Sequence, residues 1–152
     1  MKNNYYDVAY NELLYLEEDY HKTQYNPMVV LMEQVTEKML KSVLELITTG
    51  VEDLLKSHNL KRIYEKIHSI DEDFELNVFE LGYLKDFYFE ARYPGENFVT
   101  VSRKQAKVCL SIMYRVIEEV NKFRERNGMQ FYSVEEKFLT PLDGELESFP
   151  TE

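Results

Sequence analysis

The chain has 152 residues, of which 44% are hydrophobic and 30% are charged, and its formal net charge is −10. This length suits one domain with a single hydrophobic core, and the composition is too apolar for a disordered chain. The acidic charge argues against indiscriminate binding to nucleic acid phosphates, which depends on clustered lysine and arginine.

The sequence predicts a cytoplasmic protein with no membrane association. Its longest apolar run, residues 28–32, is far shorter than the roughly 20 residues needed to cross a bilayer. The N-terminus also lacks the apolar stretch of a signal peptide. The one cysteine, Cys109, lies among apolar residues at helical spacing, which predicts a buried thiol and neither a disulfide nor a cysteine-based zinc site.

Two amphipathic helices are predicted in the first third of the chain. The first extends from Tyr5 to about Tyr20 on the spacing of its apolar residues. The second is expected to begin with Asn26 as its N-cap and Pro27 in the first helical position, and to end at Gly50, where glycine can adopt the left-handed conformation.

One apolar stripe and one polar face are expected on this second helix. The stripe contains Met28, Leu31, Val35, Met39, Val43 and Leu46. The polar face contains Glu33, Glu37, Lys41 and Glu45, at intervals of four residues. By spacing alone, Glu37 and Lys41 form a surface ion pair worth a few tenths of a kcal/mol.

In the rest of the chain, the sequence pattern predicts two or three further helices and no strand. A short helix is expected over residues 59–68 and another over about residues 76–91, followed by a loop at residues 92–97 that contains Pro94. The last helix begins with a capping box, Ser102 to Gln105, and ends at Asn127-Gly128. The expected fold class is all-α, an antiparallel up-and-down bundle of four to five helices.

A short acidic C-terminal tail is expected beyond this bundle. The predicted division is a helical domain over residues 1–128 and a tail over residues 129–152, which holds six acidic residues and one lysine. Because Pro141, Gly144 and Pro150 interrupt the tail and its carboxylates repel one another, we expect it to be largely extended and to pack little of its length.

Three short blocks carry a family resemblance. They are Gln34–Lys41 with the pattern Gln-x-x-Glu-Lys-x-x-Lys, Ser57-His58-Asn59-Leu60, and Ala91-Arg92-Tyr93-Pro94. In this order they resemble the HEPN family (higher eukaryotes and prokaryotes nucleotide-binding domain) over about residues 5–125. The family's usual second block is Thr-His-Asp-Leu, so Ser57 and Asn59 depart from it, although both can still cap a helix.

The resemblance implies an all-helical module with a nucleotide- or phosphate-binding site, and we assign no catalytic residue. The candidate binding residues are Glu37, Lys38, Lys41, His58, Arg92 and Tyr93. We expect their side chains to border one cleft, because a bundle turns its apolar stripes inward and leaves polar groups along its seams. No metal and no cofactor are expected, because the sequence has no glycine-rich phosphate loop and no His-Glu metal spacing.

HEPN ribonucleases resemble one another in an Arg-x(4–6)-His element near the last helix. No histidine follows Arg92 at that spacing. Arg62 and His68 match the spacing, but six helical steps place the two side chains about 120° apart, and the pair lies in a different helix. The sequence therefore leans against an enzyme and predicts no ribonuclease activity, although it leaves the question open.

Simpler structural roles compete with these assignments. His58 suits a helix start as well as a ligand contact, and His21 and His68 suit ordinary surface positions. Arg92 can pair with a carboxylate such as Glu37. The basic residues Arg103, Lys107 and Arg115 suit either a binding strip or a solvated helix face.

The leading hypothesis is a non-catalytic HEPN module that binds a nucleotide or an RNA end. The resemblance implies a separately encoded minimal nucleotidyltransferase as partner, in a toxin–antitoxin or defence-type system. A homodimer is also expected, because half of the twelve tyrosines lie in the first 25 residues and cannot all enter one core. The alternatives are a dimeric ribonuclease toxin, using His58 or His68 with Arg92 across the subunits, and an interaction domain whose tail, Phe131–Phe149, docks a partner.

Overall fold

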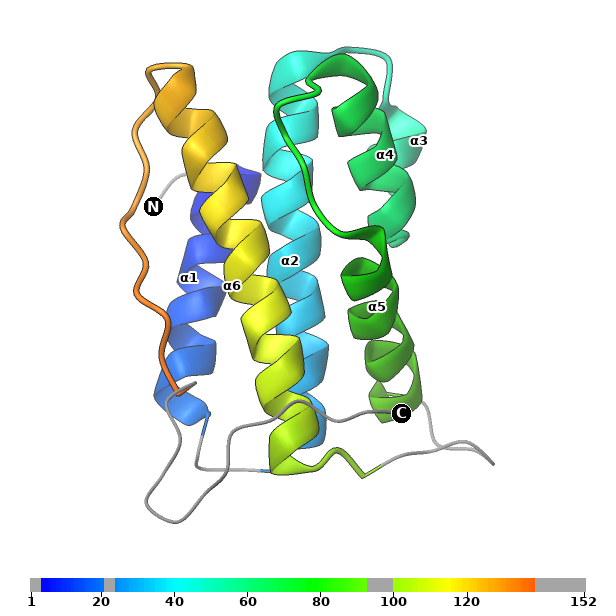
Figure 1. Ribbon diagram of the computed structural model, residues 1–152, viewed down its shortest axis with the longest axis vertical. Helices are drawn as coiled ribbons and strands as arrows, with labels where there is room; N and C mark the ends of the chain where they lie inside the picture. The colour runs from blue at the N-terminus through cyan, green and yellow to red at the C-terminus, as the bar shows by residue number, and fades with distance from the viewer. Residues whose placement is uncertain (1–3, 21–23, 93–99, 139–152) are drawn as a thin grey trace.

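The computed structural model describes residues 4–20, 24–92 and 100–138, and within these ranges it contains helices and no strands. The helices are α1 (Tyr5–Asp19), α2 (Tyr25–Ile47), α3 (Glu52–Leu55), α4 (Leu60–Ile70), α5 (Val78–Arg92) and α6 (Arg103–Arg126). The predicted all-α bundle is therefore confirmed (Figure 1).

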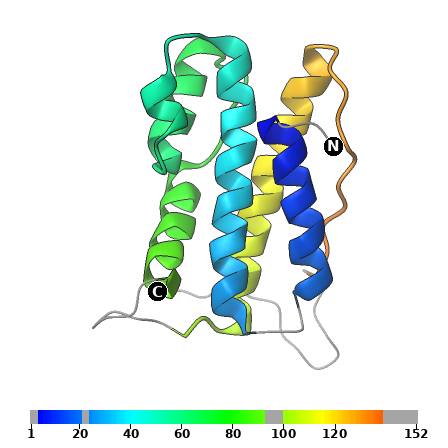
Figure 2. The same ribbon diagram turned by 180° about the vertical axis from the view of Figure 1, so that it is seen from behind.

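Helix α2 lies at the centre of the bundle and packs against α1, α4, α5 and α6. Figures 1 and 2 show α1 antiparallel to α2, whereas α6 follows the same direction as α2. The shorter helices α4 and α5 are stacked along one side, so together they cover a length that α2 covers alone. Because α2 is packed on nearly every side, it has little surface left for solvent.

Local signals in the sequence located several helix ends correctly. Ser102 and Gln105 form the predicted capping box at the start of α6. Gly50 and Gly128 follow α2 and α6 with φ of +72° and +67°, a region that L-residues with side chains rarely adopt. Cys109 is buried, as predicted, and its burial raises the pKa of the thiol to about 12.

The start of α2 differs from the prediction. The helix begins at Tyr25, so Asn26 lies in its first turn and is not the N-cap. The Asn26 side chain instead accepts a hydrogen bond from the backbone N–H of Val101, at 2.8 Å. A long-range contact has thus taken the side chain that local capping would have used. The four-residue helix α3 was not predicted.

The single apolar stripe expected on α2 was too narrow. Leu46 is 49% exposed and Leu31 is only half-buried, whereas other apolar residues of the helix are fully covered. The additional buried residues are Val29, Met32, Leu40 and Leu44. A central helix contacts neighbours around most of its circumference, so an analysis based on one apolar face cannot identify its whole buried surface.

Residues 129–138, here called the strap, have no regular secondary structure and descend beside α1 and α6 (Figure 1). The ring of Tyr132 stacks on Tyr6 and Tyr10, with centroid separations of 5.6 and 4.1 Å. Phe138 stacks on the buried Tyr20 at 4.8 Å. The strap therefore contacts α1 through stacked aromatic rings, although none of its residues is fully buried, and the little-packed tail stays a prediction. Residues 139–152 lie outside the described residues.

Side chains of α1 and α6 hold the backbone of the strap. The Tyr6 hydroxyl accepts the N–H of Tyr132 at 2.9 Å, and Asn121 donates to the C=O of Tyr132 at 2.9 Å. Tyr6 also donates to Asn121 at 2.7 Å, so both backbone polar groups of Tyr132 meet one connected pair of side chains. Lys137 pairs with Glu17 of α1 at 3.5 Å.

Candidate functional site

The polar residues of α2 form a buried layer rather than the solvent-exposed face expected. Glu33, Glu37 and Lys41 are 1%, 8% and 4% exposed, and only Glu45, at the end of the series, is open to solvent. Because α4 and α5 cover this side of α2, the polar residues must find partners within the protein.

Glu37 is held by a lysine and a histidine. Lys41 Nζ donates to Glu37 Oε2 at 2.8 Å, and the two side chains are 5% and 10% exposed. His58 Nδ1 lies 3.0 Å from Glu37 Oε1 and 3.2 Å from Oε2. The pair predicted as a surface ion pair is thus buried, and removing either partner would leave an unpaired charge away from water.

His58 presents its outer edge to solvent, since its side chain is 73% exposed. A carboxylate can only accept hydrogen bonds, so the contact with Glu37 assigns a proton to His58 Nδ1. Nε2 then accepts a hydrogen bond when the ring is neutral and donates one when it is protonated. The pairing of His58 with Glu37 orients a polar group towards solvent.

The turn that carries His58 is fixed by its neighbours. Asn59 is the N-cap of α4, and its side chain accepts the N–H of Arg62 at 3.1 Å. The N–H of Asn59 donates to Ser57 Oγ at 3.1 Å, and Leu60 is buried. Asn59 therefore has the capping role expected of it, whereas Ser57 bonds the N-cap residue and does not itself cap the helix.

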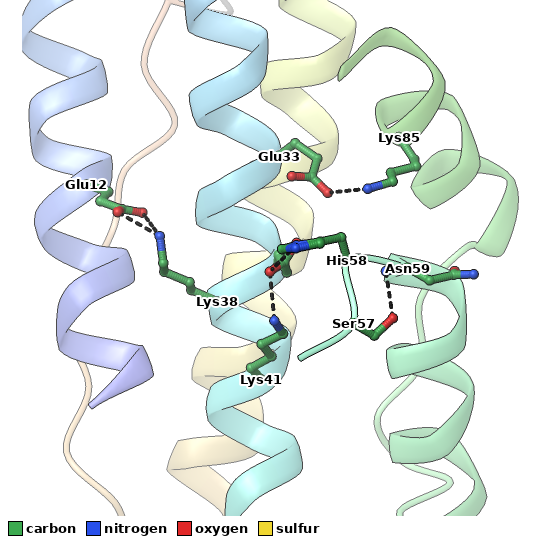
Figure 3. A network of polar contacts seen from close by, with 9 residues as sticks. Glu12, Glu33, Lys38, Lys41, Ser57, His58, Asn59 and Lys85 are labelled. Atoms are coloured by element: carbon green, nitrogen blue, oxygen red, sulfur yellow. Dashed lines mark hydrogen bonds and ion pairs between the residues drawn. The ribbon is translucent and has the colours of Figure 1, made fainter. Parts of the chain in front are cut away.

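The structure separates Lys38 from His58. Lys38 Nζ donates to both carboxylate oxygens of Glu12 in α1, at 2.9 and 2.7 Å. Figure 3 shows Lys38 turned towards α1, whereas His58 lies on the other side of α2, towards α4. Lys38 therefore ties α1 to α2 and does not share a site with His58.

A second ion pair, between the buried Glu33 and the half-buried Lys85, was not predicted. Lys85 of α5 lies 3.4 Å from Glu33 Oε2, on the same side of α2 as His58 (Figure 3). Burial is the main cause that raises the pKa of Glu33 to about 7, and Glu37 raises it further, while Lys85 and His58 lower it. The spacing of four places Glu33 on the same side of α2 as Glu37, but only the fold shows which lysine meets Glu33.

The Arg92 segment is described only in part. Arg92 is the last residue of α5, so it is helical and not part of the predicted loop, and its side chain lies outside the described residues. Tyr93 and the rest of the predicted loop lie there too, as does His21. Position 92 follows Lys85 by two helical turns, or about 10 Å along α5. The predicted cleft between Arg92 and His58 stays a prediction.

The basic strip expected on α6 does not form as an open surface. Arg115 donates to both carboxylate oxygens of Glu80, at 3.0 and 2.9 Å, and Lys107 is 2% exposed. Of the three residues of the strip, Arg115 is thus paired with a carboxylate and Lys107 is buried. Lys107 fits neither alternative, whereas Arg115, whose side chain is 42% exposed, fits a solvated helix face with an ion pair.

His68 has a structural role in α4. Its Nδ1 bonds the backbone C=O of Phe74 at 2.9 Å, and its ring stacks on Tyr64 at 5.6 Å. His68 is therefore half-buried, and the prediction of an ordinary surface position was wrong. Arg62 is exposed in the first turn of the same helix, so the structure gives no support to an Arg62–His68 pair as a site.

Two negative findings apply to the described part of the chain. No group of three histidine, cysteine, aspartate or glutamate side chains is arranged there to hold a metal ion. No helix within it is long and apolar enough to cross a membrane.

Comparison with known proteins gives one match. The family model described as HEPN domain matches residues 4–123, a range that contains the buried layer of α2, the His58 turn and the Arg92 position. Comparison with curated proteins and with solved structures gave no match. Because the family model spans most of the sequence and the fold is the expected helical bundle, the chain belongs to the HEPN domain family.

Proposed function

We propose that this chain is a non-catalytic HEPN module that binds a nucleotide or an RNA end. The observation that carries the proposal is the contact of three candidate residues, Glu37, Lys41 and His58. The first two are buried, and His58 is exposed to solvent. Glu37 and Lys41 position the ring, and the exposed His58 faces the ligand. Arg92 and Tyr93 supply further contacts to phosphate and base.

The absence of catalysis is part of the proposal. Arg62 and His68 match the ribonuclease spacing, but both lie within α4, and His68 bonds the backbone C=O of Phe74. A ribonuclease toxin is the second candidate, because a histidine oriented by a carboxylate can accept a proton from a ribose hydroxyl. In that alternative, His58 of one subunit acts with Arg92 of another.

The proposal extends to partners. We infer that the module forms a homodimer and works with a separately encoded minimal nucleotidyltransferase, in a toxin–antitoxin or defence-type system. Family membership supports this inference. Co-expression with a nucleotidyltransferase encoded by a neighbouring gene, followed by co-purification, tests the association.

One experiment separates binding from cleavage. The purified protein is incubated with a fluorescently labelled single-stranded RNA that carries a 5′-phosphate, and both anisotropy and RNA length are followed. We expect binding without shortening of the RNA, and His58→Ala should weaken binding while His68→Asn should not. Cleavage that is lost in His58→Ala would favour the ribonuclease, and absence of binding by the folded protein would overturn the proposal.

A further inference from the structure

The two buried carboxylates of α2 are neutralised unequally. Glu37 has Lys41 at 2.8 Å and His58 at 3.0 Å. Glu33 is more deeply buried, at 1% exposure, yet its ion pair with Lys85 is 3.4 Å long. A carboxylate removed from water needs close partners to remain charged, so Glu33 is the member of this layer that is most readily protonated.

Lys85 is the most accessible cation of the layer. Its side chain is 29% exposed, and its Nζ lies 4.6 Å from the centre of the Tyr88 ring. An ammonium group has three donors, and a long ion pair together with an aromatic face leaves it capacity for a stronger acceptor. A phosphate oxygen is such an acceptor.

Three ionisable groups act on Glu33. Lys85 approaches from α5, His58 from the connection between α3 and α4, and Glu37 lies one turn along α2. With His58 neutral, the two glutamates of this layer cancel Lys41 and Lys85, so an approaching phosphate meets no net positive charge. Protonation of Glu33 leaves one positive charge in excess, and Lys85 is its exposed carrier.

We propose that Glu33 and Lys85 form a proton-gated anion site, in which a terminal phosphate replaces Glu33 as the partner of Lys85 while Glu33 takes up a proton from solvent. This inference rests on the proposed function, because it names the phosphate of the bound nucleotide or RNA end as the group recognised. His58, on the same side of α2, lies beside this site (Figure 3). Phosphate binding and protonation then favour each other reciprocally.

The test measures binding of the labelled 5′-phosphorylated RNA as a function of pH. Because the pKa of Glu33 is about 7, only about a tenth of the wild-type protein is protonated there at about pH 8, and the apparent affinity falls by the same factor. Glu33→Gln should therefore bind about tenfold more tightly than wild type at that pH. Below about pH 6 the two proteins should bind almost equally.

Calorimetry supplies an independent readout. In two buffers of different ionisation enthalpy, wild type should take up about half a proton more than Glu33→Gln when it binds the RNA near pH 7. Titration of the phosphate itself occurs in both proteins and cancels in the difference. Lys85→Met should lose most of the affinity, whereas Lys66→Met, which removes the same charge from an exposed position on α4, should not.

The outcomes distinguish the inference from the proposed function. If wild type and Glu33→Gln bind with the same pH profile, or if Lys85→Met binds like wild type, the proton-gated site is overturned while RNA binding stands. If folded wild type binds at no pH, both fail. Should Lys85→Met not fold, the double variant Glu33→Gln/Lys85→Met can replace it, because it leaves no unpaired carboxylate. The double variant is expected to bind the RNA weakly and to lack the part of the pH dependence that comes from Glu33.

Discussion

At the scale of single residues, Glu33 couples the stability of the fold to pH. Its pKa is raised from 4.5 to about 7, so the folded protein holds this proton more tightly than the unfolded chain does. The destabilising effect of the charged form is absent below about pH 4.5, grows as the pH rises through this window and is complete above about pH 7.

Glu33→Gln should therefore stabilise the protein under alkaline conditions. We expect the free energy of unfolding to increase by roughly 2–3 kcal/mol above pH 8, and the gain to vanish towards pH 4. Urea denaturation across this range provides the measurement, with Glu65→Gln at an exposed position of α4 as control. A gain that is independent of pH would contradict the assignment.

Asn59 offers a second prediction at this scale. Its side chain caps α4 and fixes the turn that carries His58. Asn59→Ala should lower the free energy of unfolding by about 1 kcal/mol, and it should also weaken RNA binding. Asn59→Asp restores both the cap and the residue usual in the family, so it should behave like wild type. Thermal unfolding and anisotropy measure the two effects.

At the scale of secondary-structure elements, the strap is expected to stabilise the bundle. A chain ending at Gly128 would uncover Tyr6 and Tyr20, which are 3% and 0% exposed with the strap in place. We expect it to lose roughly 3 kcal/mol or more of unfolding free energy, because several aromatic contacts are removed at once. A chain ending at Phe138 keeps the strap and should lose little; equal losses from both truncations would show that the strap itself contributes nothing.

Helix positions could be predicted well because their signals are local. Gly50, Gly128 and the Ser102 capping box act within one turn of the chain, and the structure contains each of them. The start of α2 was misjudged because Asn26 bonds Val101, a residue far along the sequence. Helix α3 is a single turn, which is too short to show an apolar period.

The candidate site could be predicted only in part. The family pattern singled out Glu37, Lys41 and His58, and the structure brings these three together. The pattern could not reveal that Glu37 and Lys41 are buried, because α2 has the charge spacing typical of a solvated helix. Lys85 was missed because nothing in the sequence of α5 indicates that its lysine meets Glu33. Lys38 was assigned to the cluster by its place in the motif, yet it faces Glu12.

At the scale of the whole molecule, the predicted homodimer has a candidate surface on α1. Leu14 and Tyr15 are 45% and 64% exposed there, and exposed aromatic residues are favoured in interfaces. Light scattering should give twice the monomer mass of 18.2 kDa at high concentration. Tyr15→Glu should shift the mass towards the monomer, and Ser69→Glu on α4 should not. A monomer at every concentration would refute the dimer.

The docking of the strap also determines how the molecule folds. The N–H of Tyr132 meets the hydroxyl of Tyr6 across 126 positions of the chain, whereas α1 and α2 are neighbours in sequence. Contacts of low contact order form quickly, and distant ones must first overcome a larger loop-closure entropy. The helices should therefore assemble first and the strap should close over them last. In the native protein it should reopen without global unfolding, so its amides should exchange with deuterium faster than those of α2.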